Sequence, residues 1–150
     1  MYAFKGCTAL ETISIPSTVS SIGGYAFEEC TSLLNITLHS NITVIEPYLF
    51  SKCTALKEIS IPSTVSTISK YAFNCCSSIS RIMIPSSVKS IGTYAFTCCT
   101  SLRQLTIPAS VKQVGYYVFV DCTSLRHLVL PKDLEINMLG IDPNAKVIRS

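Results

Sequence analysis

Hydrophobic residues recur along this chain with a fixed period of 23 residues. Aligned on phenylalanine, the repeat reads Tyr-Ala-Phe-x-x-Cys-Thr-Ser-Leu-x-x-Ile-x-Ile-Pro-Ser-x-Val-x-x-Ile-Gly-x. The phenylalanine column consists of Phe4, Phe27, Phe50, Phe73, Phe96 and Phe119. One such unit cannot bury its apolar side alone, but stacked copies bury a continuous core. The pattern therefore predicts a single-domain solenoid of six coils.

Spacing within the repeat predicts the local structure. Apolar and polar residues alternate in Ile59–Ile61, which is typical of a half-buried strand, and Pro62 ends that strand because proline has no N–H to donate. The Val65-x-x-Ile68 spacing predicts a second, looser extended run on the opposite side. The three-residue spacing in Tyr-Ala-Phe-x-x-Cys predicts one 3₁₀ or short α-helical turn, with phenylalanine forming an internal aromatic spine. The main strands are expected to stack in parallel about 4.8 Å apart.

The C-terminal tail departs from the repeat. Asn137 stands where isoleucine is expected, and Gly140 stands where the next Tyr-Ala-Phe would begin. Residues 144–149 predict a final short strand over the last coil. We therefore assign residues 1–131 to the tandem repeats and 132–150 to a C-terminal cap, because terminal repeats of solenoids are atypical. The first coil has no such cap, and its open strand edge favours self-association into a homo-oligomer.

Across about residues 1–134 the repeat resembles the BspA-like, or Treponema-type, leucine-rich repeat. The resemblance implies a leucine-rich-repeat solenoid of the α/β horseshoe type, with mostly short parallel strands and 3₁₀ or short helical turns. Members of this family occur in oral and gut bacteria and in mucosal protists, and many are surface proteins that bind host matrix proteins or other cells. The resemblance thus implies a non-enzymatic protein-binding scaffold that is secreted or displayed at the cell surface, with a host matrix or cell-surface protein as its partner.

The outward positions of the main strand vary from coil to coil, whereas the inward positions do not. We take these variable positions as the candidate protein-binding residues: Glu58, Arg81, Met83, Arg103, Gln104, Arg126 and His127. Basic residues gather in the C-terminal half of this set, while acidic ones lie further towards the N-terminus. A face polarised in this way favours a partner with an acidic patch. The alternative is a solvated face without a partner.

Six of the eight cysteines form a column with one cysteine per coil. We expect this column to be a buried ladder of thiols, because free cysteine packs as a small hydrophobe. Cys75 and Cys98 are additional, precede the ladder by one position, and are expected to be more exposed. A bridge between these two, or two reactive thiols, is the alternative. Without a Cys-x-x-Cys motif or a histidine at ligand spacing, no metal site is expected.

Several classes of function are disfavoured. Only His39 and His127 are available as bases, and neither has a matching acid in a repeat column, so we expect no catalytic site. A thiol-dependent redox enzyme is the least favoured class, and no glycine-rich loop indicates a cofactor. The net charge of +3 without a Lys/Arg run gives no indication of nucleic-acid binding. No apolar run approaches the length of a membrane span.

The cellular location is left open by the sequence. No basic start, apolar segment or cleavage site of a signal peptide is present, so the chain is expected to be either a cytosolic protein or a piece of a longer secreted one. Two N-glycosylation sequons begin at Asn35 and Asn41, and such tripeptides also arise by chance in threonine-rich repeats. A glycan on Asn35 would obstruct the candidate binding face.

Overall fold

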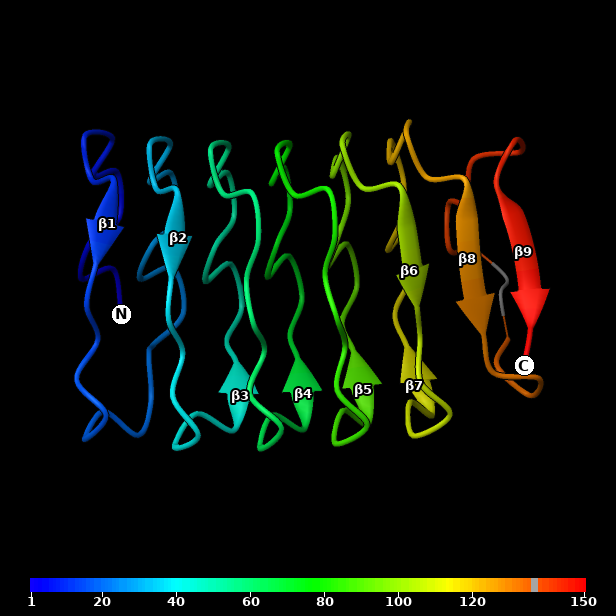
Figure 1. Cartoon of the computed structure of the whole chain (residues 1–150), viewed down its shortest axis with the longest axis horizontal. Coiled ribbons are helices and arrows are strands. Elements are labelled where there is room, and N and C mark those ends of the chain that lie inside the picture. The colour runs from blue at the N-terminus through cyan, green and yellow to red at the C-terminus, as the bar shows by residue number, and fades with distance from the viewer. Residues whose placement is uncertain (136–137) are drawn as a thin grey trace.

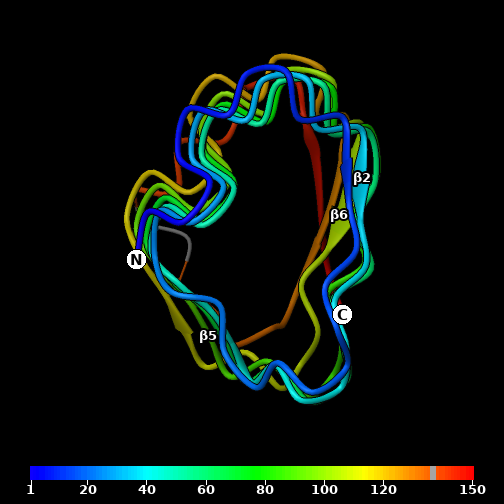
Figure 2. The same cartoon turned by 90° about the vertical axis from the view of Figure 1, so that its left-hand side faces the viewer.

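A computed structural model of the chain describes residues 1–135 and 138–150. The chain winds into coils that stack side by side along one axis (Figure 1). Viewed along that axis, each coil is a flattened closed loop, and successive loops superimpose (Figure 2). The departure from the repeat expected at Asn137 lies outside the described residues.

One long side of the loop carries the main parallel strands. They are β1 (Thr12–Ile13), β2 (Asn35–Ile36), β6 (Gln104–Thr106), β8 (His127–Leu130) and β9 (Lys146–Arg149). β1 pairs with β2, and β6, β8 and β9 form a three-stranded sheet in that order. Single bridges continue the ladder between these two sheets, namely Thr37–Ser60, Ser60–Met83 and Arg81–Gln104. The predicted parallel strand face is therefore present.

The opposite side carries the second extended run that the sequence predicts (Figure 2). Its four short strands are β3 (Val44–Ile45), β4 (Thr67–Ile68), β5 (Ser90–Ile91) and β7 (Gln113–Val114). All of them pair in parallel, in the order β3-β4-β5-β7. The N–H of Val65 donates to the carbonyl of Pro62 at 3.0 Å, so the proline that ends the main strand also begins the turn towards this second run.

The prediction of a 3₁₀ or short α-helical turn in the Tyr-Ala-Phe-x-x-Cys segment was wrong. Within residues 1–135 and 138–150 the structure contains no helix. The three-residue hydrogen bonds do form, from Glu28 N–H to Tyr25 O at 3.2 Å and from Cys30 N–H to Phe27 O at 3.1 Å. However, the alternate amides of Phe27 and Glu29 donate to the next coil, and Tyr25 and Glu29 have positive φ angles of 63°. Left-handed residues cannot continue a right-handed helix, so this side is a row of turns that also hydrogen-bonds one coil to the next.

The core lies between the two strand runs and is built from the uniform columns of the repeat. From Phe27 to Phe119, each phenylalanine is almost completely buried and stacks on its neighbours at centroid distances of 5.4–6.2 Å. From the second coil onwards, the cysteine column is buried beside them, as is the leucine column, which consists of Leu33, Leu56, Ile79, Leu102 and Leu125. Phe4, in the first coil, remains 36% exposed because only one side of it is covered. The sequence prediction of an internal aromatic spine is confirmed.

The final strand expected in the tail is present as β9, which pairs in parallel with β8. The guanidinium of Arg149 donates to the carbonyls of Pro131 at 2.8 Å and Leu134 at 2.6 Å, which ties the end of the chain to the last repeat. The division into repeats and cap near residue 131 stays a prediction. No helix in the described part of the chain is long and apolar enough to cross a membrane.

Candidate protein-binding face

The variable positions of the main strand run point away from the core, as the alternation of the strand predicts. All seven candidate residues are exposed, whereas the isoleucine and leucine residues between them are buried. Met83 is the most exposed of the apolar side chains on this face, at 74%. An exposed methionine surrounded by polar residues is a common anchor at adaptable binding surfaces.

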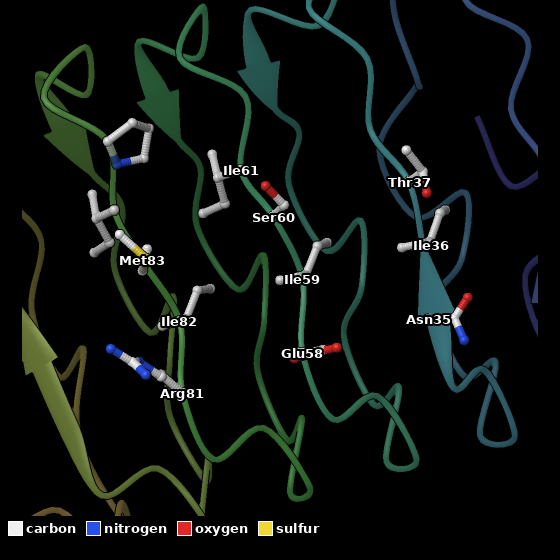
Figure 3. A pocket seen from close by; sticks show the side chains of 12 residues that line it. Asn35, Ile36, Thr37, Glu58, Ile59, Ser60, Ile61, Arg81, Ile82 and Met83 are labelled. Atoms are coloured by element: carbon white, nitrogen blue, oxygen red, sulfur yellow. The ribbon is translucent and has the colours of Figure 1, made fainter.

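Three of the candidates line a shallow depression over the second to fourth coils (Figure 3). Its volume is about 570 Å³. Glu58, Arg81 and Met83 are part of its wall, together with Asn35 of β2, while its floor is formed by buried isoleucines of the same strand run. The depression thus offers an apolar floor, one exposed apolar side chain and charges of both signs.

The remaining four candidates lie beside this depression, with Gln104 and His127 at the first positions of β6 and β8 and with Arg103 and Arg126 directly before them. The predicted site therefore separates into two parts. Arg81 is bridged to Gln104, and Gln104 pairs with His127, which places these three side chains in one row across adjacent coils. The guanidinium of Arg126 donates to the carbonyls of Thr123 and Leu125 at 3.0 and 3.2 Å and is held along its own coil. Arg81 therefore presents its charge more freely than Arg126.

Sequence reasoning missed Lys146. It pairs with His127 in the register of β8 and β9. Lys146 therefore extends the row of Arg81, Gln104 and His127 by one strand and adds a positive charge to it. The spacing from His127 to Lys146 is 19 residues (146 − 127), four fewer than the repeat period of 23, and the column alignment therefore did not include it. A test for shortened final coils would have found this residue.

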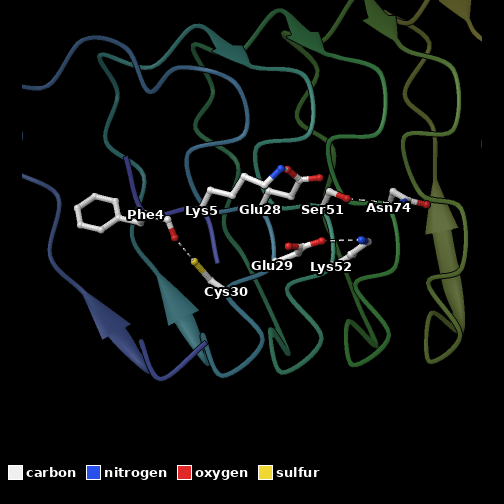
Figure 4. A network of polar contacts seen from close by, with 8 residues as sticks. All are labelled: Phe4, Lys5, Glu28, Glu29, Cys30, Ser51, Lys52 and Asn74. Carbon is white, nitrogen blue, oxygen red and sulfur yellow. Dashed lines mark hydrogen bonds and ion pairs between the residues drawn. The ribbon is translucent and has the colours of Figure 1, made fainter. Parts of the chain in front are cut away.

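A second variable column lies on the turn side, away from the strand face (Figure 4). Lys52 Nζ lies 2.6 Å from Glu29 Oε1 in the preceding coil, and this hydrogen bond and charge lower the pKa of Glu29. One position earlier, Lys5 Nζ lies 2.7 Å from Glu28 Oε2, and this contact raises the pKa of Lys5. The ion pairs connect neighbouring coils, so they support the stack rather than a ligand.

The tyrosines of the repeat form a stacked ladder that sequence reasoning also did not single out. Tyr25, Tyr48 and Tyr71 stack at centroid distances of 4.6 Å, and each is partly exposed. Desolvation, with the neighbouring tyrosines contributing, raises the pKa of Tyr48. Because each ring face is covered by the next ring, only the edges and hydroxyl groups face solvent, and the ladder is best explained as a contact between coils.

The thiol ladder is buried as predicted, apart from Cys7 in the first coil. Each buried thiol donates to a phenylalanine carbonyl of an earlier coil, as Cys76 does to Phe50 at 3.0 Å and Cys99 to Phe73 at 3.2 Å. Burial raises the pKa of both thiols well above the ordinary value. These groups are neutral hydrogen-bond donors in the core, without the thiolate character that a nucleophile needs.

The two histidines lie far from any arrangement that would suit catalysis. His39 is partly buried, and its Nε2 lies 2.8 Å from the carbonyl oxygen of Ile15. His127 is exposed on β8. Among the described residues, no three histidine, cysteine or acidic side chains gather closely enough to hold a metal ion.

Stacked coils with a parallel strand face and variable outward side chains define a leucine-rich-repeat solenoid. The chain belongs to the family described as the BspA type leucine-rich repeat region, which matches six copies over residues 1–126. Proteins of this family and fold are typically non-enzymatic scaffolds that commonly bind other proteins. No curated protein matches the chain in sequence.

Solved structures show the same fold. A leucine-rich-repeat protein of T. pallidum is 28% identical, with a TM-score of 0.81 over 93% of this chain and 69% of its own. A leucine-rich-repeat protein of Bacteroides ovatus is also 28% identical, with a TM-score of 0.77 over 93% of this chain and 34% of its own. The chain thus spans about a third of the Bacteroides protein. A leucine-rich cell-surface protein of Faecalibacterium prausnitzii, 22% identical over 95% of this chain and 48% of its own, has a TM-score of 0.72 and supports the fold alone.

Proposed function

We propose that this chain is a non-enzymatic scaffold that binds a protein through its main strand face. The observation that carries the proposal is the depression lined by Glu58, Arg81 and Met83, in which a methionine that is 74% exposed stands above a floor of buried isoleucines. An exposed apolar anchor surrounded by polar groups suits a protein contact, because the anchor gains burial while the rim supplies orientation. In this proposal residues 132–150 act as the cap of the scaffold.

Charge indicates the kind of partner surface. Arg81, Arg103, His127 and Lys146 make the C-terminal half of the face basic, whereas Glu58 lies further towards the N-terminus. A partner that places an acidic patch over β6 and β8 and an apolar side chain over Met83 would complement both parts. Adhesion to a matrix or cell-surface protein, with the scaffold itself outside the cell, is the form of this function that the family resemblance favours.

The proposal is tested by removing three charges from this face. A variant with Arg81→Ser, Arg103→Ser and Arg126→Ser should bind immobilised extracellular-matrix extract at least about tenfold more weakly in biolayer interferometry, with a smaller salt dependence. The matched control carries Lys70→Ser, Lys89→Ser and Lys112→Ser, which removes the same charge from exposed positions near the second strand run. Equal binding by both variants would remove the strand face as the site.

Self-association is a second candidate, favoured by the surface of the first coil. There Phe4 is 36% exposed, and it lines an apolar depression of about 300 Å³ together with Ile13, Ile15 and Val19. The main-strand edge of β1 is also open on this side (Figure 1), and exposed edges pair readily with other chains. A second copy placed against this coil would cover the apolar surface and complete the strand pairing.

Light scattering over a range of concentrations tests this second candidate. The 150-residue chain is expected to associate as its concentration rises, and Phe4→Lys, which places a charge in the apolar depression, should return it to the monomer. The control is Met83→Lys on the strand face, which should leave association unchanged. A chain that is monomeric at every concentration would exclude the self-assembling role.

A further inference from the structure

Cys75 and Cys98 occupy the same position in two consecutive coils. Both have a left-handed backbone, with φ angles of 57° and 58°. The N–H of Cys75 donates to the carbonyl of Thr97, the residue before Cys98, at 2.8 Å. Both side chains are only partly buried. The two thiols are therefore direct neighbours across the stack, and reagents in solution can reach them.

Side chains in this column reach one another between coils. Two coils earlier, Glu29 and Lys52 occupy the same positions and form their ion pair at 2.6 Å (Figure 4). On the other side, Cys98 Sγ lies 3.8 Å from Oδ2 of Asp121 in the following coil. Cys75 Sγ lies 3.6 Å from Oδ1 of Asn74 in its own coil. A coil spacing of about 4.8 Å falls inside the range of Cα separations that disulfides span, about 4.4–6.8 Å.

We propose that Cys75 and Cys98 are a redox modification site, at which a low-molecular-weight disulfide such as glutathione disulfide oxidises the two thiols to an intramolecular disulfide. One protein thiolate attacks the small disulfide, which forms a mixed disulfide and releases one small thiol. The second protein thiolate then attacks the protein sulfur of the mixed disulfide and releases the second small thiol. The two protein thiols lose two electrons and two protons, and the small disulfide gains them as two thiols.

The other cysteines do not compete for this bridge. Cys53, Cys76 and Cys99 are completely buried, and each donates its thiol hydrogen to a backbone carbonyl at 3.0–3.2 Å. Only Cys7 is exposed among the ladder thiols, and it lies in the first coil, far from this pair. Burial, with Cys75 and Asp121 contributing, raises the pKa of Cys98 to about 11, so the exchange is expected to accelerate as pH rises.

The experiment uses the full chain with Cys7→Ser, which removes the exposed thiol outside the pair. The folded protein is incubated with glutathione disulfide at about pH 9–10, because the raised pKa of Cys98 leaves little thiolate at lower pH. We expect intact mass to fall by about 2 Da, the loss of two hydrogens. Peptide mapping should join the peptides of Cys75 and Cys98, and reductant should restore the original mass.

Two further variants keep the proposal falsifiable. Adding Cys75→Ser or Cys98→Ser should stop the reaction at one mixed disulfide, a gain of about 305 Da, because the second thiol is missing. Both variants are expected to fold, since the same left-handed position holds Glu29, Lys52 and Asp121 in other coils. Two glutathione adducts on the Cys7→Ser chain, or no reaction at either thiol, would overturn the proposal.

Discussion

The rings of Phe73 and Phe96 stack with their centroids 5.4 Å apart and their planes 1° from parallel. Both rings are completely buried, so each coil contributes one ring to a continuous spine. We predict that Phe73→Ala lowers the free energy of unfolding by about 3–5 kcal/mol, because it removes a buried ring and leaves a cavity between two coils. Chemical denaturation measured by circular dichroism checks this value.

Phe4→Ala is the matched control for this prediction. The same residue of the repeat is 36% exposed in the first coil and stacks on one side alone, at 5.3 Å from Phe27. Its loss is expected to cost less than about half as much, since less apolar area returns to water. Equal costs at both positions would mean that stacking between coils does not account for the stability.

The thiols should divide into two classes by accessibility. Cys7, Cys75 and Cys98 are exposed or partly exposed, whereas the other five (8 − 3) are buried. We therefore predict that a chromogenic disulfide reagent titrates three thiols in the reduced, folded protein and all eight after unfolding. A count of eight in the folded state would show that the core does not protect the five buried thiols from the reagent.

The reactivity of Cys98 should depend on its acidic neighbour. Burial is the main reason that the pKa of this thiol is raised to about 11, and Cys75 and Asp121 raise it further. Removing the negative charge with Asp121→Asn lowers this pKa, so a larger fraction is thiolate at a given pH below 11. We predict a two- to fivefold faster alkylation of Cys98, an order-of-magnitude expectation for one nearby charge.

Alkylation of Cys98 is followed by mass spectrometry between about pH 7 and pH 10, where the rate should rise roughly tenfold per pH unit because only the thiolate reacts. Asparagine is a suitable replacement because it tolerates the left-handed conformation that Asp121 adopts, with a φ of 56°. Asp133→Asn, at an exposed position in the tail, is the control. An unchanged rate in Asp121→Asn would contradict the electrostatic explanation.

The attachment of the tail should depend on Arg149. Its guanidinium donates to the carbonyls of Pro131 and Leu134, and charged hydrogen bonds of this kind are worth more than neutral ones. We predict that Arg149→Ala destabilises the last coil by about 1–3 kcal/mol and leaves the earlier coils unaffected. Hydrogen exchange should be faster at the amide of Lys146, which donates to Arg126 O at 2.7 Å.

Lys146→Ala provides the comparison, because its side chain is exposed while its backbone pairing with His127 remains. Faster exchange throughout the repeats in Arg149→Ala would indicate that residues 132–150 are not a separate cap. Exchange confined to the last coil would support the proposed boundary near residue 131.

Most of the fold could be predicted because the same pattern of buried, exposed and turn-forming residues recurs in six copies of the repeat. The alternation around Ile59 and Ile61 predicts a strand that Pro62 ends; in this coil Ser60 forms single parallel bridges to its neighbours, Ile59 and Ile61 are buried, and the chain turns at Pro62. The Tyr-Ala-Phe-x-x-Cys segment misled the prediction, because a three-residue spacing fits both a helical turn and a row of β-turns. Which of these forms depends on whether the alternate amides bond within the coil or to the next coil, and one repeat alone does not contain that information.

The candidate face could be predicted only in part. The outward positions of Arg81, Met83 and Gln104 follow from strand alternation, and their exposure agrees with it. Lys146 could not be aligned, since the last coil is shorter than the others. The restraint of Arg126 by the carbonyls of its own coil depends on a side-chain conformation that the sequence pattern does not determine.

The sequence by itself determined the number of coils, the buried columns and the faces on which side chains vary, because a 23-residue period returns every column to the same place in each coil. The tertiary structure decided which of those variable residues meet. Stacking places Cys75 beside Cys98, and it gathers Glu58, Arg81 and Met83 around one depression. The physical reason is that these contacts form between coils. Which side chains meet there depends on the register of neighbouring coils, on side-chain direction and on the hydrogen bonds between the coils.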